Sequence, residues 1–399
     1  MKSGVGWTEG QRSPRVLFVT SWYPEPGRPM AGAFVRDHAR ALAGLASVTV
    51  LHLPDPKEGR YAWSPPVLEE DAAERKAWGI FTFRLRAPLP PRGLGYLAAL
   101  AWGQWAFERV WEEQGPFDLV HAHIFRAGLV AALGAKRHQV PMLVTEHSSA
   151  VARGRLRPVD RIVAAAAYRA ADLLCPVSEN LGRAMRRLAP RTPVRVVGNT
   201  VDRDIFHPPV SWDRSDSASV RMLFVGRLHE VKGLDVLFDA LTLLEQDPDT
   251  RGRWRLDLVG DGPMRQRLAQ MAQAGGFASR LRFVGYLPRR QVAEAMRNAD
   301  LFVLPSRWEN MPCVLLEALA CGLPAVASRV GGIPEVLDPA VGILAPPGDP
   351  DALAAALRDA ILDMGRFQRQ KVAVRGSEFG FSAVGKQLLD CYQLAQRGS

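Results

Sequence analysis

The feature of the sequence that most constrains the fold is a segment that occurs twice. Arg15–Trp22, "RVLFVTSW", and Arg221–Leu228, "RMLFVGRL", are near-copies that begin about 206 residues apart. Each opens with a continuous apolar run typical of a buried parallel strand, and each runs into a loop and then a helical stretch. The sequence therefore predicts two halves built on one plan.

Further strand-like runs alternate with helical stretches in both halves. They are "VTVLHL", "DLVHAHI", "PMLVTEHS", "DLLCPVS" and "RVVGN" in the first half, and "RLDLVGDG", "RLRFVGYL", "DLFVLPS" and "PAVAS" in the second. This alternation predicts an α/β fold class with two Rossmann-like, doubly wound parallel-sheet domains. In such an arrangement we expect a ligand in a central cleft, held by strand-end loops of both domains.

The domain boundaries follow from a break in the pattern. Residues 199–219, "NTVDRDIFHPPVSWDRSDSAS", are rich in Pro, Asp and Ser and have no sustained period, which predicts a linker. We therefore expect an N-terminal domain over residues 1–200 and a C-terminal domain over residues 201–381, with the linker counted in the second. The segment "GVGWTEG" precedes the first strand, and we expect a mobile tail there with no part in phosphate binding.

The composition fits a protein without a membrane span or a disulfide framework. Apolar residues make up 47% of 399 residues, which is enough for two cores, and the four cysteines form no CxxC pair. No apolar run reaches the roughly 18–20 residues that cross a bilayer, and the first dozen residues lack a signal-peptide core. We expect a cytoplasmic location, with peripheral contact at the inner face of the cell membrane left open.

Positive charge is concentrated in one stretch. The formal net charge is +10, and residues 141–200 hold ten arginines and four acids, a net charge of +6. Such a surface suits anionic lipid, an acidic or phosphorylated acceptor, or nucleic acid, or it is simply a solvated face. No nucleic-acid module accompanies it, so we expect no nucleic-acid partner.

Two carboxylates stand in an otherwise apolar segment, "SRWENMPCVLLEALACGLPAV", from Ser306 to Val326. Pro312 suits a helix start and Gly322 the position after a helix end, which predicts a helix over Pro312–Cys321. Glu309 then lies in the loop before the helix, at the carboxyl end of a strand where ligands collect. Glu317 lies inside the helix among apolar neighbours and needs a partner. The alternative is a helix cap for Glu309 and a partly exposed Glu317.

The loop "VGRLHEVKGLD" (Val225–Asp235) carries two cations to the end of a strand. Gly226 and Gly233 allow tight turns, while Arg227 and Lys232 match the charge of a diphosphate. The spacing is not that of a Walker A motif, and a solvated turn is the alternative.

Two other loops offer close backbone approach. "LVGDGP" places Gly262 in a Gly-x-Gly turn, which is weak evidence for a nucleotide contact because the third glycine is absent. "RPMAGAFVRDHA" opens a helix at Gly32, where backbone amides can meet phosphate oxygens.

Histidines raise the question of a metal. His147 follows a strand in "TEHSS", where it is a ligand contact or a structural histidine. His121 and His123 share a strand face, but no third ligand is evident, and the Asp-x-Asp pairs at 247–249 and 202–204 lie away from strand ends. We predict no metal and no cofactor, with the positive charge at the site coming from side chains and helix ends.

These motifs occur together and in order, and with them the chain resembles a GT-B fold, family 4 retaining glycosyltransferase ("glycosyl transferases group 1"). The resemblance covers nearly the whole length and rests on "GRLHEVKGLD", "LVGDGP", "SRWENMPCVLLEALACGLPAVAS", "VGGIPE" and "GNTVDRDIF". Asn310 and Ala31 depart from it, each standing where the family more often has glycine. It implies an acceptor-side first domain, a second domain that binds the nucleotide sugar, and a last helix, 382–399, that packs back on the first domain.

The resemblance also implies roles for single residues. Arg227 and Lys232 bind the diphosphate of the donor, Glu317 the ribose hydroxyls and Glu309 the hydroxyls of the transferred sugar. His147 lies near the 6-position of the sugar, and Gly32 near phosphate and acceptor. We therefore assign Arg227, Lys232, Glu309 and His147 to catalysis, and assign to donor binding Glu317, Gly32, Gly226, Gly262, Asn310, Met311, Pro312, Cys313 and Val314.

The implied reaction is metal-independent transfer of a hexosyl group from a nucleoside-diphosphate sugar to an acceptor hydroxyl, with retention of configuration. No carboxylate nucleophile stands out, so we favour attack on the face from which the diphosphate leaves. Glycolipid, exopolysaccharide or cell-envelope glycan synthesis is the expected setting, with a glycan, lipid-linked or small-molecule acceptor. "LGYLAALAWGQWAFERVW" (Leu94–Trp111) fits a helix at a lipid interface or an aromatic core. Three alternative functions share this architecture. They are an inverting glycosyltransferase, a UDP-sugar 2-epimerase, and a nucleotide-sugar-binding subunit without catalytic activity.

Overall fold

A computed structural model describes residues 12–25, 27–28, 30–55, 65–88, 94–212 and 219–398. The chain divides into two compact units, which are treated separately below. The first unit is Met1–Asn199 together with Phe381–Ser399, and the second unit is Thr200–Gly380. The segment "GVGWTEG" and residues 213–218 of the predicted linker lie outside the described residues.

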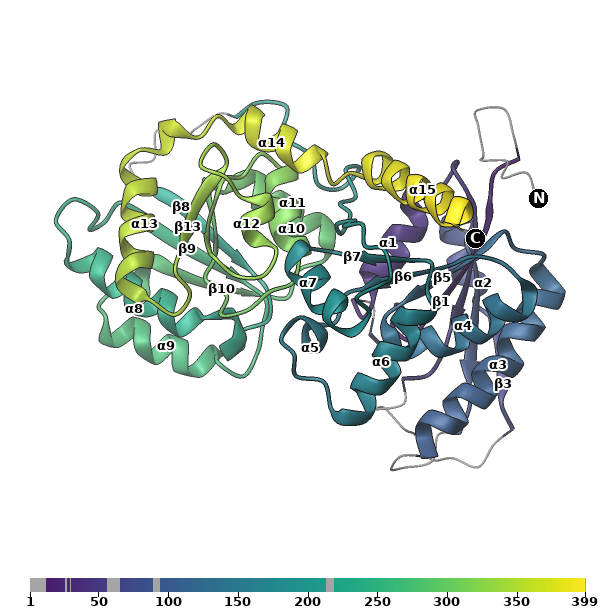
Figure 1. The fold of residues 1–399 in the computed structure, drawn as a ribbon. Coiled ribbons are helices and arrows are strands. Elements are labelled where there is room, and N and C mark those ends of the chain that lie inside the picture. Colours follow the sequence, from purple (N-terminus) through teal and green to yellow (C-terminus); the bar gives the residue numbers. More distant parts are fainter. Residues whose placement is uncertain are drawn as a thin grey trace. The chain divides into compact units, whose positions relative to one another are not determined.

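The first unit is built on a seven-stranded sheet with the order β3-β4-β2-β1-β5-β6-β7 (Figure 1). All neighbouring strands are parallel except β3 and β4, which pair antiparallel at one edge. The strands are β1 (Arg15–Thr20), β2 (Ser47–His52), β3 (Val67–Glu70), β4 (Phe81–Arg86), β5 (Leu119–His123), β6 (Met142–Glu146) and β7 (Leu173–Pro176). The central strands β1, β5 and β6 are almost entirely buried, as expected for parallel strands between two helical layers, although β5 and β6 also carry polar side chains.

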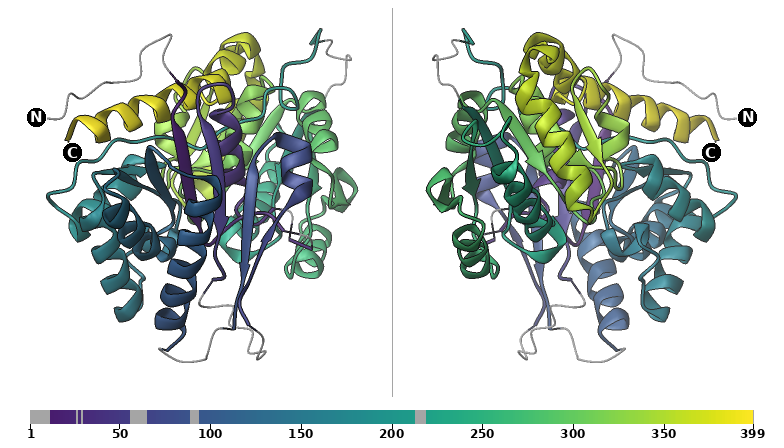
Figure 2. Two further views of the ribbon diagram at one scale, coloured as in Figure 1. Left: turned by 90° about the vertical axis from the view of Figure 1, so that its right-hand side faces the viewer. Right: turned by 90° about the vertical axis from the view of Figure 1, so that its left-hand side faces the viewer.

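Helices cover both faces of this sheet. They are α1 (Ala33–Ala41), α2 (Ala72–Trp78), α3 (Leu94–Gln114), α4 (Phe125–His138), α5 (Ser149–Ala152), α6 (Pro158–Ala170), α7 (Glu179–Leu188) and α15 (Phe381–Gly398). The last helix, α15, lies beside α1, although the two are far apart in the sequence (Figures 1 and 2). Its apolar face, with Leu388 and Tyr392, joins one core with Phe18 of β1 and Val35 of α1.

The second unit is built on a six-stranded sheet with the order β10-β9-β8-β11-β12-β13, parallel throughout. The strands are β8 (Val220–Val225), β9 (Trp254–Val259), β10 (Leu281–Gly285), β11 (Leu301–Leu304), β12 (Ala325–Ser328) and β13 (Gly342–Ala345). The helices are η1 (Glu230–Lys232), α8 (Leu234–Gln246), α9 (Arg265–Ala274), η2 (Ala278–Arg280), α10 (Arg289–Asn298), α11 (Cys313–Ala320), α12 (Ile333–Val336), α13 (Pro350–Leu362), η3 (Met364–Arg366) and α14 (Arg369–Ser377). Strand order reverses between β8 and β11, so the loops at their carboxyl ends lie at a topological switch point.

The predicted α/β class is confirmed, with several local differences. "RVVGN" (residues 195–199) is no regular strand: the N–H groups of Arg195 and Val197 donate to Leu174 and Pro176 of β7, and the isolated bridge beside it is made by Val194, the residue before the segment. The antiparallel strand β3 departs from the parallel pattern. The helix predicted over Pro312–Cys321 is α11, Cys313–Ala320, with Pro312 as its N-cap in extended conformation. No helix in the described part of the chain has the length and apolar character that a bilayer span requires.

The described part of the predicted linker packs on the second unit. Phe206 is fully buried and lies 5.4 Å from the Arg289 guanidinium, measured to the ring centroid. The N–H of Val201 donates to the carbonyl of Phe379 at 2.7 Å. The segment lacks a regular period because it forms irregular structure against a folded surface rather than a helix or strand.

Candidate functional site

The strand-end loops of the second unit are tied to one another by backbone hydrogen bonds. After β8, the N–H of Leu228 donates to the carbonyl of Asp261 after β9 at 3.0 Å. After β11, the N–H of Arg307 donates to the carbonyl of Val231 at 2.9 Å. Gly226 and Gly262 lie in the first two of these loops. The predicted donor-binding loops of the second unit therefore form one connected surface.

Lys232 and Glu309 meet in this surface, as their positions at neighbouring strand ends predict. Lys232 Nζ lies 2.6 Å from Glu309 Oε1, which also accepts a hydrogen bond from Ser306 Oγ at 2.8 Å. The two side chains are 21% and 12% exposed, so the pair is poorly screened by solvent. Lys232 and Glu309 thus present a fixed cation and a fixed carboxylate after the adjacent strands β8 and β11.

Arg227 adds a second cation at the end of β8. It is exposed. Its backbone carbonyl accepts the N–H of His229 at 2.8 Å, but its guanidinium makes no hydrogen bond or ion pair with another described residue. An arginine without a carboxylate partner keeps all its N–H donors available for an anion.

Gly331 fixes the backbone on the other side of Glu309. Its φ is +55°, and a Cβ atom placed there would lie 1.9 Å from the Glu309 carbonyl oxygen. The next residue, Gly332, donates its N–H to the carbonyl of Asn310 at 2.6 Å. Only glycine fits this approach, so the segment after β12 holds the Glu309–Asn310 backbone in place.

The segment after Glu309 leads directly into α11. Met311 is buried, Pro312 is the N-cap, and Cys313 and Val314 open the helix. The first N–H groups of a helix have no acceptor within it, and the helix dipole is positive at this end. The segment from Asn310 to Val314 therefore places backbone donors beside the Lys232–Glu309 pair.

Glu317 has a partner that the sequence analysis did not identify. Arg289 Nη2, from the first turn of α10, lies 3.1 Å from Glu317 Oε1. The apolar surroundings of Glu317 were the signal that a partner was needed, but the contact joins two helices whose packing no local pattern reveals. The Glu317 carboxylate, 13% exposed, is thus paired with a cation.

In the first unit, Gly32 and His147 are brought together through α1. Gly32 is the N-cap of this helix with a φ of +66°, and a Cβ there would lie 2.4 Å from the backbone of Trp22. Phe34, two residues later, stacks on the His147 ring with centroids 4.1 Å apart. Burial holds the pKa of His147 well below its ordinary value, so the imidazole is neutral.

A buried carboxylate, Glu146, holds the loop that carries His147. It accepts backbone hydrogen bonds from Phe125 at 2.9 Å, His147 at 2.9 Å and Ser148 at 2.7 Å, and one from the Tyr168 hydroxyl at 2.6 Å. Burial raises the pKa of Glu146, while these four hydrogen bonds oppose the rise. Glu146 carries no sequence signal of its own, because nothing in "TEHSS" shows that its carboxylate turns back onto the loop backbone.

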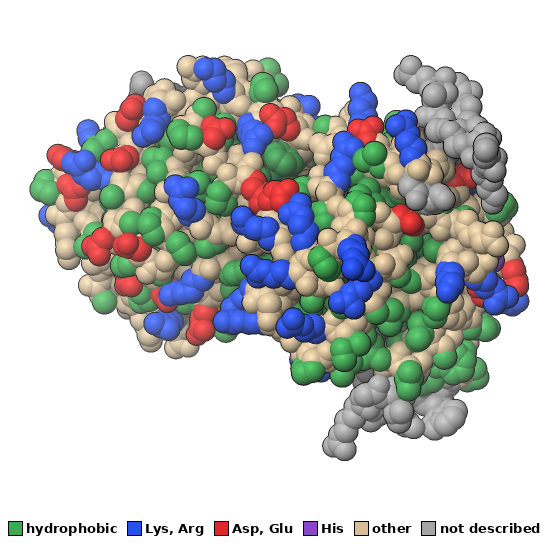
Figure 3. Space-filling view, in the orientation of Figure 1, with side chains coloured by type: hydrophobic (Ala, Val, Ile, Leu, Met, Phe, Trp, Pro, Cys, Tyr) green, Lys and Arg blue, Asp and Glu red, His purple; other side chains and the backbone are tan. Residues whose placement is uncertain are grey.

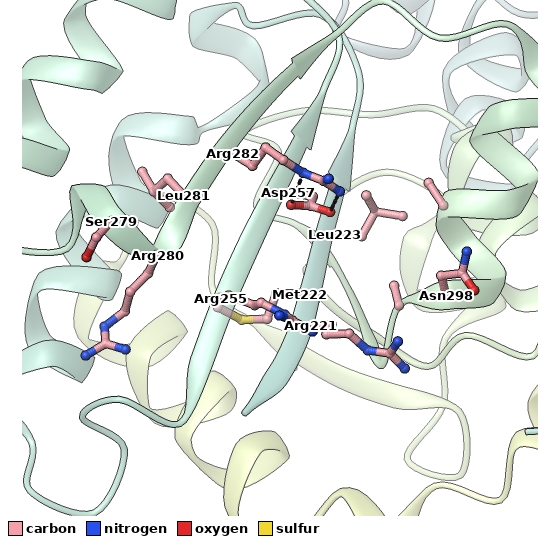
Figure 4. Close-up of a pocket in the computed structure, with 12 residues that line it drawn as sticks. Arg221, Met222, Leu223, Arg255, Asp257, Ser279, Arg280, Leu281, Arg282 and Asn298 are labelled. Carbon is pink, nitrogen blue, oxygen red and sulfur yellow. Dashed lines mark hydrogen bonds and ion pairs between the residues drawn. The ribbon is translucent and has the colours of Figure 1, made fainter. Parts of the chain in front are cut away.

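A surface pocket of about 450 Å³ lies elsewhere on the second unit (Figure 4). It is lined by Arg221, Arg255, Arg280, Arg282 and other residues from the beginnings of β8, β9 and β10 and the end of α10. The guanidinium of Arg221 is paired with Asp300, and that of Arg282 with Asp257. The pocket is at the amino ends of the strands, and none of the predicted site residues lines it.

Comparison with known proteins identifies the family. Residues 214–375 match the model for glycosyl transferases group 1, and residues 31–200 match the model for a glycosyl transferase 4-like domain. The D-inositol 3-phosphate glycosyltransferase of Xylanimonas cellulosilytica is 30% identical over 430 residues, 97% of this chain and 98% of that protein. The chain belongs to the group 1, family 4 glycosyltransferases. A glycogen synthase of Mycobacterium tuberculosis is also 30% identical, over 70% of each chain.

Solved structures place this glycosyltransferase in the GT-B fold class. Sucrose-phosphate synthase from Thermosynechococcus elongatus aligns with a TM-score of 0.74 at 24% identity, over 97% of this chain and all of that one. Anabaena HepE in complex with UDP aligns with a TM-score of 0.72 at 20% identity, over 94% of this chain and 99% of that one. The predicted family and fold are confirmed, whereas the roles assigned to single site residues stay predictions.

Proposed function

We propose that this glycosyltransferase moves a hexosyl group from a nucleoside-diphosphate sugar to an acceptor hydroxyl, with retention at the anomeric carbon and without a metal ion. The observation that carries the proposal is the pairing of Lys232 with Glu309 at the carboxyl ends of β8 and β11, together with Arg227, a second cation after β8 whose side chain makes no ion pair with any described residue. Two cations suit a diphosphate, and an acid suits sugar hydroxyls. HepE, of the same fold, has been solved with UDP and with UDP-glucose, which supports a nucleotide-sugar donor.

The remaining assigned residues complete this scheme. In the second unit, Glu317 would bind the ribose, and the turns at Gly226 and Gly262 and the segment Asn310–Val314 would approach the nucleotide and diphosphate with their backbones. In the first unit, His147 would contact the sugar and the backbone at Gly32 the phosphate. The helix dipole of α11 adds positive potential where the diphosphate would lie.

The chemical step that this scheme favours takes place on one face of the sugar. The acceptor oxygen forms a bond to the anomeric carbon, the bond from that carbon to the diphosphate oxygen breaks, and a donor phosphate oxygen takes the acceptor's proton. Arg227 and Lys232 would stabilise the negative charge that develops on the leaving diphosphate, in the place where other enzymes use a metal. No carboxylate nucleophile is required.

The donor and the stereochemistry can be tested together. A thermal-shift panel of UDP, GDP and ADP and their sugars should show stabilisation by one nucleotide series. With that donor and an acceptor mixture, release of the nucleoside diphosphate should be unaffected by EDTA, and the product's anomeric proton should show the donor's configuration by NMR. An inverted product would contradict retention, and consumption of donor without acceptor would indicate an epimerase.

Two acceptor classes have support. Relatives named D-inositol 3-phosphate glycosyltransferases favour a phosphorylated small molecule. A lipid-linked or glycan acceptor at a membrane is favoured by the surface of the first unit, where apolar side chains gather beside Lys and Arg (Figure 3). In the same unit, Leu97 of α3 is 65% exposed and Ile162 of α6 is 70% exposed, and the hydroxyl of Tyr96 joins the two helices by a hydrogen bond to Asp160. The partly exposed aromatic helix α3 thus faces solvent on one side.

We expect this surface to bind anionic membranes. Leu97→Glu combined with Ile162→Glu should reduce co-sedimentation with phosphatidylglycerol vesicles by about tenfold, because each substitution removes apolar area and adds repulsion. Leu394→Glu, on the exposed side of α15, is the matched control and should bind as wild type. Equal binding of all three proteins would remove the case for a membrane-bound acceptor at this surface.

A further inference from the structure

Three histidines from separate elements converge in the first unit. His38 lies in α1, His123 ends β5, and His147 follows β6. Their candidate ligand nitrogens all lie within 4.8 Å of one another, and in the described part of the chain they are the one such group of three potential metal ligands. The ring centroids form a nearly equilateral triangle, with separations of 5.7 Å for 38–123, 5.6 Å for 38–147 and 5.8 Å for 123–147.

Several ring nitrogens of His38 and His123 are buried without a hydrogen-bond partner among the described residues. His38 Nε2 lies 3.0 Å from the carbonyl oxygen of Gly198, so this nitrogen carries the proton and Nδ1 carries the lone pair. His38 Nδ1 and both ring nitrogens of His123 are buried and have no hydrogen-bond partner among the described residues. A buried polar atom without a partner costs about 1–3 kcal/mol, so such atoms call for an explanation.

His121 shows that burial alone does not leave a histidine without hydrogen-bond partners. It precedes His123 by two residues on the same strand and is equally buried. Its Nδ1 lies 2.9 Å from the Tyr392 hydroxyl, and its Nε2 lies 2.7 Å from Thr145 Oγ1. The sequence suggested His121 and His123 as a pair, but the fold satisfies the first and directs the second toward His38 and His147.

The arrangement fits a tetrahedral metal ion. Three imidazole nitrogens bound at Zn–N distances of about 2.0–2.1 Å lie about 3.3 Å apart. The nitrogens here lie within 4.8 Å of one another, so inward movements of at most about 0.9 Å each would complete the site. All three rings are buried, and a neutral imidazole is the form that binds a metal ion. The Gly198 carbonyl orients His38 as second-shell acceptors orient metal-binding histidines. Imidazole donors without a carboxylate favour zinc, copper, nickel or cobalt over magnesium.

We propose that His38, His123 and His147 bind a divalent transition metal ion such as zinc, and that the bound ion inhibits glycosyl transfer. The inhibition rests on the proposed function, because it requires that the His147 imidazole contact the sugar. A metal would fix that ring against α1 and β5 and occupy the lone pair that it offers to a hydroxyl. His147, with 8% of its surface exposed, is the member through which an ion would enter. The ion would act only as an inhibitor, because transfer itself needs no metal in our proposal.

Metal binding is tested without any reaction. Wild-type protein should bind one equivalent of Zn²⁺ by calorimetry, and Co²⁺ should give the visible absorption of a tetrahedral site. His123→Leu should weaken Zn²⁺ binding by about 100-fold without loss of thermal stability, because it removes two unsatisfied nitrogens. His38→Gln, whose amide can still donate to Gly198, is the second variant, and the exposed His207→Gln is the control. Absence of stoichiometric binding, or equal binding by His123→Leu, would overturn the site.

Inhibition is then measured in the transfer assay. Zn²⁺ should inhibit transfer by the wild-type protein and by His207→Gln at the concentration where calorimetry shows binding. EDTA should restore their activity. The His123→Leu variant should keep its activity at the same Zn²⁺ concentration. Zn²⁺ binding without inhibition of transfer would contradict the proposed inhibition but not the proposed metal site. A wild-type protein that binds Zn²⁺ yet transfers no sugar from any nucleotide donor would contradict the proposed function and its regulation, while the calorimetry would still decide the site.

Discussion

Replacing Lys232 by methionine is expected to lower kcat by about 100- to 1,000-fold, the range seen when one preorganised charge is removed from a developing anion. Methionine keeps much of the side-chain length and removes the charge that now lies 2.6 Å from Glu309. Because that charge acts on the leaving diphosphate, the loss should appear mainly in kcat rather than in KM. Steady-state rates of nucleoside diphosphate release, with the donor identified by thermal shift, give the measurement.

A purely structural role for the Lys232–Glu309 pair makes a different prediction. In that case Lys232→Met and Glu309→Gln would lower the melting temperature together and leave kcat nearly unchanged. Lys371→Met, at an exposed position on α14, is the matched control and should behave as wild type. A Lys232→Met enzyme with wild-type kcat would show that the leaving group finds its positive charge elsewhere.

The meeting of Lys232 and Glu309 could be predicted from sequence because parallel strands impose it. Each residue follows an apolar run that ends at the same edge of one sheet, so 77 residues of separation do not matter. The same reasoning placed Gly226, Gly262 and the segment before α11. Strand periodicity and strand ends are local signals, and a parallel α/β fold converts them directly into positions in space.

Contacts between helices could not be predicted in this way. Arg289 reaches Glu317 from α10, and His38 reaches His123 and His147 from α1. Both contacts depend on how a helix is rotated on its sheet, and an amphipathic pattern does not fix that rotation to the level of one side chain. In the sequence, His38 belongs to a loop-to-helix motif far from His123 and His147, so no local pattern indicates it as a third metal ligand.

The two differences between predicted and observed strands have a common physical cause, because both lie at an edge of the sheet. β3, "VLEE", is short, mostly exposed and at the sheet edge, so it carries little apolar signal. "RVVGN" has the apolar pattern of a strand, but it makes only isolated pairing with β7: Arg195 donates to Leu174 at 2.9 Å and Val197 to Pro176 at 3.0 Å. Edge segments are defined by how long the pairing continues, and the sequence of the segment itself does not encode that length.

The largest loss of stability in the first unit is expected from Glu146→Gln, about 3–5 kcal/mol of unfolding free energy. Both carboxyl oxygens of Glu146 accept a backbone N–H, Oε1 from His147 and Ser148 and Oε2 from Phe125. A glutamine in either orientation turns an NH₂ group toward one of these donors, so one buried contact becomes repulsive and unsatisfied. Because the side chain has the same shape, the loss would come from hydrogen bonding rather than from packing.

Tyr168→Phe separates the two kinds of contact that Glu146 makes. It removes only the hydroxyl donor at 2.6 Å and leaves the backbone acceptors intact, so we expect a loss of about 1–2 kcal/mol. Glu179→Gln, an exposed change in the first turn of α7, should cost well under 1 kcal/mol. Urea unfolding of the three variants gives the comparison, and equal stability of Glu146→Gln and wild type would rule out this account. If the order holds, the position of His147 depends on the carboxylate immediately before it, since the same oxygen that binds its N–H also anchors the start of α5.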